Sequence, residues 1–325
     1  MQVDDGSSRD EIIEQTSPEL TAEPVTTPDS IPTGADRSPD GIARYLNEQN
    51  LQRARADFAF LISMLEAEFP EIELCIRKDY LNLYSRGNSL SQIEFQQNNM
   101  YKISIGRKFY DKSLASKDSR FSKYERKGTR AELCVTTKDL RSFFQRRYIK
   151  DLCQRIKDVN YCEEISAEHI LIVDNKDRED FIIIDRQIMF HGAKDIRMDL
   201  LALRQIEKGH NSYKFEIMEV KLGNSSDLDG EVAKQLERYT AHVESNFSSY
   251  KSCYEKHYAQ KRALKLIRFP EFDEIKIVEG VTGLLVITGY LGTAKPRLER
   301  LQQRYPDLHI EPIGLVIPAE YPKGR

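Results

Sequence analysis

The hydrophobic and polar positions of the chain predict a folded region that begins near residue 41. Apolar side chains recur at three- and four-residue steps over residues 42–65, which predicts a helix that Asp40 caps and Pro70 ends. Alternating apolar positions then predict two hairpins, with arms at residues 72–76 and 81–83, and at 92–96 and 100–105. We therefore expect a small α+β domain over residues 41–130.

A second set of patterns predicts an α/β domain over residues 131–325. An apolar stripe over residues 137–158 predicts a helix, and the chain then becomes rich in Ile, Val, Leu and Phe. These runs predict strands at residues 169–173, 181–190, 196–203, 213–222, 282–289 and 310–317. Helical periodicity predicts helices at residues 229–243, 248–268 and 295–304.

Charge changes this picture, because a net charge of −3 conceals two regions of opposite sign. Residues 1–40 hold ten acidic residues, two arginines, five of the twelve prolines and no aromatic residue, which predicts a disordered acidic leader. Residues 77–160 hold twenty Lys or Arg against nine Asp or Glu, a net charge of +11. Such a surface is suited to a polyanion.

The basic region is densest over residues 106–130, where nine Lys or Arg alternate with four aromatic residues. Cations beside aromatic rings suit phosphate contact with base or sugar stacking, although a solvated loop has the same composition. A basic face of the helix at residues 137–158 would extend this surface. The predicted nucleic-acid-binding residues are Arg107, Lys108, Lys123, Arg126, Lys127, Arg130, Arg146 and Arg147.

Candidate chemistry lies on two neighbouring strands and the helix that follows them. Glu219 and Lys221 are two apart on one strand and so share a face, where Asp199 of the preceding strand can meet them. On the following helix Gln235 and Tyr239 are four apart and also share a face. Buried charges are costly unless they are paired or bound to a metal, so this arrangement favours a Mg²⁺ or Mn²⁺ site. Such an ion polarises a phosphoryl oxygen and activates water.

These motifs, R-x-D-L-L, E-V-K and Q-L-x-x-Y in this order, resemble the PD-(D/E)XK nuclease superfamily. The likeness is to its RecB-like branch, which includes archaeal and actinobacterial mismatch and branched-DNA endonucleases, and it covers residues 165–245. It implies a restriction-endonuclease-like αβββαβ core with a central mixed sheet over about residues 137–290. Met198 stands where the family name has Pro, and the twenty-residue gap between Asp199 and Glu219 is longer than usual.

The resemblance implies roles for individual residues. Asp199, Glu219 and the carbonyl of Val220 would bind the metal, Lys221 would be the catalytic lysine, and Gln235 with Tyr239 would support the site. The acid that the first core helix normally contributes is Glu163, Glu164 or Glu168, and we select Glu164 as the catalytic candidate. The implied activity is hydrolysis of DNA phosphodiester bonds by a Mg²⁺- or Mn²⁺-dependent endonuclease in repair, restriction or defence against phage.

The sequence is compatible with functions other than that of a DNA nuclease. The chain is also compatible with a non-catalytic nucleic-acid-binding or scaffold protein of nuclease-like fold, and phosphate contacts do not separate RNA from DNA. Motifs for P-loop NTPases, dinucleotide enzymes, serine hydrolases and zinc sites are missing from the sequence. We expect no membrane span or export signal, reduced cysteines, a cytoplasmic location, and action as a homodimer or with a separately encoded partner.

Overall fold

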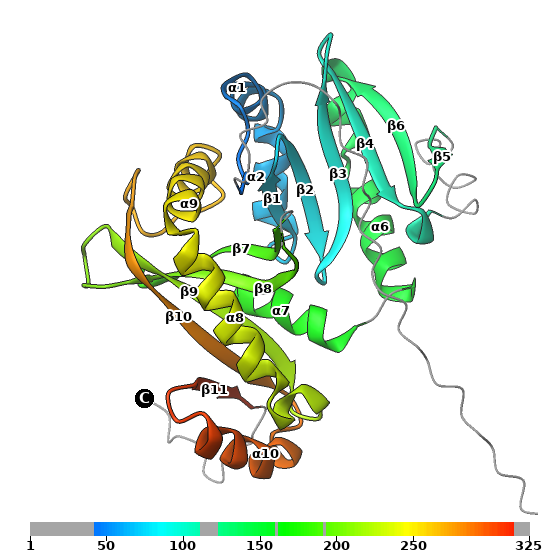
Figure 1. Ribbon diagram of the computed structural model, residues 1–325. Coiled ribbons are helices and arrows are strands. Elements are labelled where there is room, and N and C mark those ends of the chain that lie inside the picture. The colour runs from blue at the N-terminus through cyan, green and yellow to red at the C-terminus, as the bar shows by residue number, and fades with distance from the viewer. Residues whose placement is uncertain (1–41, 111–122, 160–161, 191–192, 315–325) are drawn as a thin grey trace, which may run out of the picture. The chain divides into compact units, whose positions relative to one another are not determined.

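A computed structural model describes residues 42–110, 123–159, 162–190 and 193–314, which all belong to one compact unit (Figure 1). These residues form a mixed α/β structure with two β-sheets, of which the second contains both parallel and antiparallel pairs. The predicted leader at residues 1–40 and the centre of the basic segment, residues 111–122, lie outside the described residues.

The first sheet is antiparallel, with strand order β1-β2-β3-β4-β6-β5. Both predicted hairpins are confirmed, and asparagine or aspartate at their turns takes up the left-handed backbone region, which these residues tolerate better than others. Asp79 has φ 57° in the first turn, and Asn98 and Asn99 each have φ 55° in the second. The strands are β1 Glu73–Arg77, β2 Tyr80–Ser85, β3 Asn88–Gln96, β4 Met100–Gly106, β5 Glu125–Lys127 and β6 Arg130–Thr136.

The single helix predicted over residues 42–65 is wrong, because the chain forms α1 (Glu48–Asp57) and α2 (Ala59–Glu68) with a break at Phe58. The break lies where Phe58 is fully buried and packs edge-on against Tyr101, with ring centroids 5.0 Å apart. Asn47 caps α1 in place of Asp40, since its side chain accepts a hydrogen bond from the Asn50 backbone N–H. Tertiary packing therefore decides where these helices begin and end.

The predicted helix at 137–158 is also broken, and it belongs to the first sheet. The chain forms η2 (Thr137–Asp139), α5 (Leu140–Phe143) and α6 (Arg146–Val159), whose apolar side chains join the core cluster of strands β1 to β6. Strand β6 starts at Arg130 and pairs with β4, so the boundary predicted between residues 130 and 131 cuts off part of this sheet. The first sheet and its helices extend to Val159.

The second sheet has strand order β11-β10-β9-β8-β7. Strands β7, β8 and β9 are antiparallel, whereas β9, β10 and β11 are parallel. Helices α8 and α9 cover one face of this sheet and α7 covers part of the other (Figure 1). The elements are α7 Glu163–Asp174, β7 Phe181–Phe190, β8 Ala193–Gln205, β9 Ser212–Leu222, η3 Ser226–Asp229, α8 Glu231–Ser245, α9 Phe247–Ala263, β10 Lys276–Thr288, α10 Leu291–Arg304 and β11 His309–Ile313.

All but one of the strands predicted in this half are confirmed, the last of them only as far as Ile313, because residues 315–317 lie outside the described part of the chain. Residues 169–173, predicted as a strand, lie instead in the middle of α7. A five-residue apolar run cannot distinguish a strand from a buried helix segment. In α7 Ile172 packs under the sheet while Ile170 is 57% exposed, so the helix places one of these two side chains in the core and the other in solvent.

Buried charges link the two sheets through the edge strand β7. The carboxylate of Asp185 accepts from Arg77 Nη1 at 2.6 Å and from the Tyr254 hydroxyl at 2.9 Å, and Arg44 Nε lies 3.4 Å away. Burial alone would raise the pKa of Asp185, but Arg44 and Arg77 outweigh it and lower the pKa. Asp185 therefore remains ionised and ties β1 and α9 to β7.

We predict that Asp185→Ala destabilises the protein by about 3–5 kcal/mol, because it leaves Arg77 and Arg44 buried without their counter-charge. Asp180→Ala is the matched control, since this carboxylate precedes the same strand but is 60% exposed and pairs with Arg178. Its loss should cost less than about 1 kcal/mol. Urea denaturation measures both, and equal midpoints for the two variants would contradict the structural role of Asp185.

Candidate functional site

Asp199, Glu219 and Lys221 meet where strands β8 and β9 separate. The register of these strands ends at the pair Leu200 and Met218. One residue further, the Asp199 side chain takes the place of a ladder partner, since its Oδ2 accepts a hydrogen bond of 3.0 Å from the Val220 backbone N–H. The ladder therefore ends at this point, and side chains of both strands meet beyond its last pair.

Lys221 lies at the centre of this cluster and contacts three carboxylates. Its Nζ is 3.1 Å from Glu219 Oε1, 3.5 Å from Glu164 Oε1 and 3.8 Å from Asp227 Oδ2, and its side chain is only 8% exposed. Asp227 comes from η3, and the sequence analysis did not identify it. Its one sequence signal is an acid in the turn that follows the E-V-K strand, which is too common to be informative.

The three candidates for the upstream acid all lie on the first turns of α7, but in different surroundings. Glu164, the acid predicted from the sequence, contacts Lys221. Glu168 is buried and lies 3.3 Å from Arg186, and Asp199 is among the charges that act on it. Glu163 points to the Tyr290 hydroxyl at 3.3 Å. Glu164 and Glu168 thus both adjoin the cluster, and Glu163 lies at its rim.

The carboxyl groups of the cluster are buried with too little positive charge nearby to compensate their negative charge. Burial, together with the neighbouring Asp199, raises the pKa of Glu219 to about 8, and the same two causes raise the pKa of Glu168 to about 8. Burial also raises the pKa of Asp199. Lys221 shows the reverse, because the carboxylates of Glu219 and Asp199 outweigh its burial and raise its pKa. Shifts of this kind are typical of functional sites.

Helix α8 brings the two further predicted residues to this cluster. Tyr239 is 4% exposed, and burial together with the charge of Glu219 raises its pKa. Gln235 lies one turn earlier, and its Oε1 is buried without a hydrogen-bond partner. Glu219 Oε2 is likewise buried and has no donor beside it, but the Glu219 carboxyl group lies within hydrogen-bond distance of Asp199, so the two groups can share a proton. Buried acceptors without donors cost free energy unless a further group binds to them.

The carboxylates meet the basic requirement of a divalent-cation site. Mg²⁺ binds through one or two carboxylates and keeps several waters, and the neighbouring carboxyl groups of Asp199 and Glu219 supply that number. Among the described residues no group of three or more His, Cys, Asp or Glu side chains is arranged to hold a metal ion. A site here would therefore depend on two carboxylates, the Val220 carbonyl and water.

The basic residues predicted to contact nucleic acid lie on elements of the first sheet, apart from the residues of the cluster. Arg130 is partly buried and donates to the hydroxyl and the carbonyl of Ser104 at 2.8 and 3.1 Å. Lys127 lies 3.9 Å from both Glu125 and Glu132. Arg130 is thus a structural residue of the strand pair β4–β6, and the charge of Lys127 is partly neutralised.

The remaining predicted cations differ in whether their side chains are paired or exposed to solvent. Arg146 pairs with Glu68, and Arg147 lies 3.8 Å from Asp151. Arg107 donates to the Gly128 carbonyl at 3.2 Å. Lys108, which lies over the Phe109 ring, and Lys123 are exposed, and of Arg126 only the backbone in β5 is described. The positive surface on the described part of this region is therefore weaker than its composition indicates.

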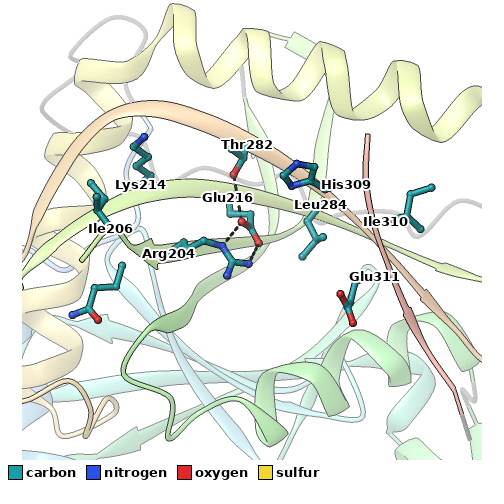
Figure 2. Close-up of a pocket in the computed structure, with 10 residues that line it drawn as sticks. Arg204, Ile206, Lys214, Glu216, Thr282, Leu284, His309, Ile310 and Glu311 are labelled. Carbon is teal, nitrogen blue, oxygen red and sulfur yellow. Dashed lines mark hydrogen bonds and ion pairs between the residues drawn. The ribbon is translucent and has the colours of Figure 1, made fainter. Parts of the chain in front are cut away.

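A groove of about 770 Å³ lies on the sheet face that α7 leaves partly open (Figure 2). Arg204 and Glu216 form a bidentate ion pair there, with both N–O distances 2.6 Å. Glu216 is three residues from Glu219 on β9, and therefore points to the opposite face of the sheet. The groove contains none of the predicted site residues and is separate from the cluster.

Comparison with protein families, curated proteins and solved structures finds no match to this chain. None of the helices in the described ranges is long and apolar enough to cross a membrane. The five cysteines, which all lie in those ranges, are free thiols. The geometry of the cluster is therefore the basis for assigning a function.

The raised pKa of Glu219 predicts how metal-free stability changes with pH. The folded protein holds a proton that the unfolded chain releases near pH 4.5, so this stabilisation is complete below that pH and is lost as pH rises toward 8. Glu219→Gln carries a neutral group at every pH. In EDTA its melting temperature should therefore rise relative to that of the natural protein as pH increases from 5 to 8.

Thermal unfolding across this range checks the prediction, with Glu237→Gln, which removes an exposed acid from α8, as the control for the loss of one charge. A melting temperature of Glu219→Gln that falls relative to that of the natural protein, or keeps a constant difference from it, as pH rises from 5 to 8 would show that Glu219 is ionised in the folded state.

Proposed function

We propose that this protein is a metal-dependent nuclease that hydrolyses phosphodiester bonds of DNA, with its active site at the opening between β8 and β9. The observation that carries the proposal is the buried cluster of Asp199, Glu219 and Lys221, in which two hydrogen-bonded carboxyl groups with raised pKa lie beside one lysine. An arrangement this costly contributes little to packing, and it suits the binding of a cation.

The order of elements around the cluster supports the further proposal of a restriction-endonuclease-like core. A helix, α7, precedes three antiparallel strands, and then helices α8 and α9 and the parallel strand β10 follow. This order matches the αβββαβ core that the PD-(D/E)XK resemblance implies, with α9 as an additional helix before the last strand. The cluster residues lie at the strand positions, and Glu164 and Glu168 lie on the first helix, as that resemblance requires.

Asp199, Glu219 and the carbonyl of Val220 are the groups that would hold Mg²⁺ or Mn²⁺. When bound, such an ion would polarise the scissile phosphate and lower the pKa of a water molecule. The two carboxylates must release their shared protons to bind a cation, so binding should strengthen as pH rises.

Lys221 serves this reaction as a fixed positive charge. The neighbouring carboxylates of Glu219 and Asp199 raise its pKa and so favour the protonated ammonium group. Held between strand β9, helix α7 and η3, its N–H groups can hold the attacking water and stabilise negative charge that develops on the phosphoryl oxygens. The carboxylates of Glu164 and Asp227 limit the positions that the ammonium group can take.

We predict that Glu219→Gln and Lys221→Met each lower the cleavage of plasmid and single-stranded DNA in Mg²⁺ or Mn²⁺ by at least about 100-fold, because each removes a charge that stabilises the reaction. Glu216→Gln is the matched control, since this carboxylate lies on the same strand but pairs with Arg204 on the opposite face. It should retain cleavage.

Normal cleavage by Glu219→Gln would refute the site. Tight DNA binding by the natural protein without cleavage in either metal would instead favour the non-catalytic binding protein.

Asp227→Asn should lower kcat several-fold and leave KM nearly unchanged, since Asp227 acts on the position of Lys221 and is not one of the proposed metal ligands. Asp227→Glu should recover part of the rate because it restores the charge. Asp229→Asn is the control on the same turn, where the carboxylate lies 3.7 Å from Arg297. Steady-state kinetics compare the three variants, and equal effects of Asp227→Asn and Asp229→Asn would contradict a positioning role.

A further inference from the structure

Tyr290 is an unusual side chain for a protein surface. In the described part of the chain six large hydrophobic residues are exposed, and Tyr290, at 51%, is the one aromatic residue among them. Its φ of 47° lies in the left-handed region, which is uncommon for a residue other than Gly, Asn or Asp. The chain thus holds an aromatic ring in solvent on a backbone conformation that costs free energy, and such outliers cluster at functional sites.

Tyr290 lies at the same edge of the sheet as the proposed active-site cluster. In the parallel pair β9–β10, Ile287 is the register partner of Lys221, so Tyr290 follows three residues beyond that pair. The turns after the two strands pack closely, because a side chain at Gly223 would come within 2.7 Å of the carbonyl oxygens of Gly289 and Tyr290. Ligands bind at such carboxyl ends of parallel strands.

Two contacts fix Tyr290, one through its backbone and one through its hydroxyl group. Its backbone forms the N-cap of α10, and its hydroxyl donates to Glu163, with 3.3 Å to Oε2. The next residue of α7, Glu164, contacts Lys221 at 3.5 Å. Tyr290 therefore reaches from the β10–α10 turn to the start of α7 and lies at the rim of the cluster, where a bound nucleic acid strand would pass.

We infer that Tyr290 is a stacking platform for an unpaired base next to the scissile phosphate, and that the substrate strand is single-stranded there. The inference rests on the proposed nuclease function and specifies its substrate. A fixed, exposed aromatic ring stacks on any base, whereas the bases of an intact duplex are already stacked and paired. The hydrogen bond to Glu163 fixes the ring in advance, which lowers the entropic cost of stacking.

The chain contains no tryptophan, which permits a direct test. Tyr290→Trp introduces a single indole whose fluorescence a stacked base quenches. We expect quenching when a short single-stranded DNA is added in EDTA, where cleavage is prevented. Tyr305→Trp is the matched control, because Tyr305 caps the opposite end of α10, and its fluorescence should stay unchanged.

Kinetics supply a second readout. Tyr290→Ala should raise KM for single-stranded DNA by about 5- to 100-fold with kcat little changed, the loss expected for one stacked base. Tyr290→Phe should raise KM less than Tyr290→Ala does, because it keeps the stacking ring and loses only the hydrogen bond to Glu163 that fixes it. Cleavage of single-stranded DNA by the natural protein without quenching of Tyr290→Trp, or with an unchanged KM for Tyr290→Ala, would overturn the inference and leave the nuclease proposal standing.

The two proposals fail in different ways. Quenching of Tyr290→Trp without cleavage in any metal would support the stacking site and refute the nuclease. A natural protein that neither binds nor cleaves DNA would refute both.

Discussion

The structure depends on one constraint, which is that the charges of Asp185 and Arg186 are buried between the two sheets and must be satisfied there. Asp185 binds β1 and α9 to strand β7 through Arg77 and Tyr254. Arg186 is fully buried and contacts Glu168 at 3.3 Å and His169 Nδ1 at 3.1 Å, which ties α7 to the same strand. Removal of one partner would leave the other charge buried without compensation. The position of α7, and with it the approach of Glu164 to Lys221, follows from this network.

The network around Asp185 and the cluster of Asp199, Glu219 and Lys221 follow the same electrostatic rule with opposite results. Burial raises the pKa of any carboxyl group, and neighbouring charges decide whether the group ionises. Asp185 has two arginines beside it, and its pKa falls. Glu219 has Asp199 and Lys221 beside it, and its pKa rises to about 8. Two arginines compensate the one charge of Asp185, whereas Glu219 and Asp199 share the single positive charge of Lys221, to which a bound divalent cation would add.

The basic region shows how weakly composition determines a surface field. Residues 77–160 carry a net charge of +11, yet Glu132, Glu68 and Asp151 lie beside cations that the sequence places in a phosphate-binding surface. Cross-strand and i,i+4 neighbours pair charges that lie several residues or whole strands apart along the chain. The described cations of this region are therefore shared between the stability of the first sheet and any role in binding.

The sequence by itself determined the local features: the two hairpins, five of the six strands predicted after residue 160, and the residues Asp199, Glu219 and Lys221 as the chemical candidates. Alternation and side-chain chemistry are local properties, so a pattern of a few residues reveals them. Only the tertiary structure decided that residues 169–173 are helical, that α6 packs on the first sheet, and that Asp227 and Tyr290 adjoin the site. Each of these depends on contacts between segments distant in sequence, whose free energy no local pattern contains.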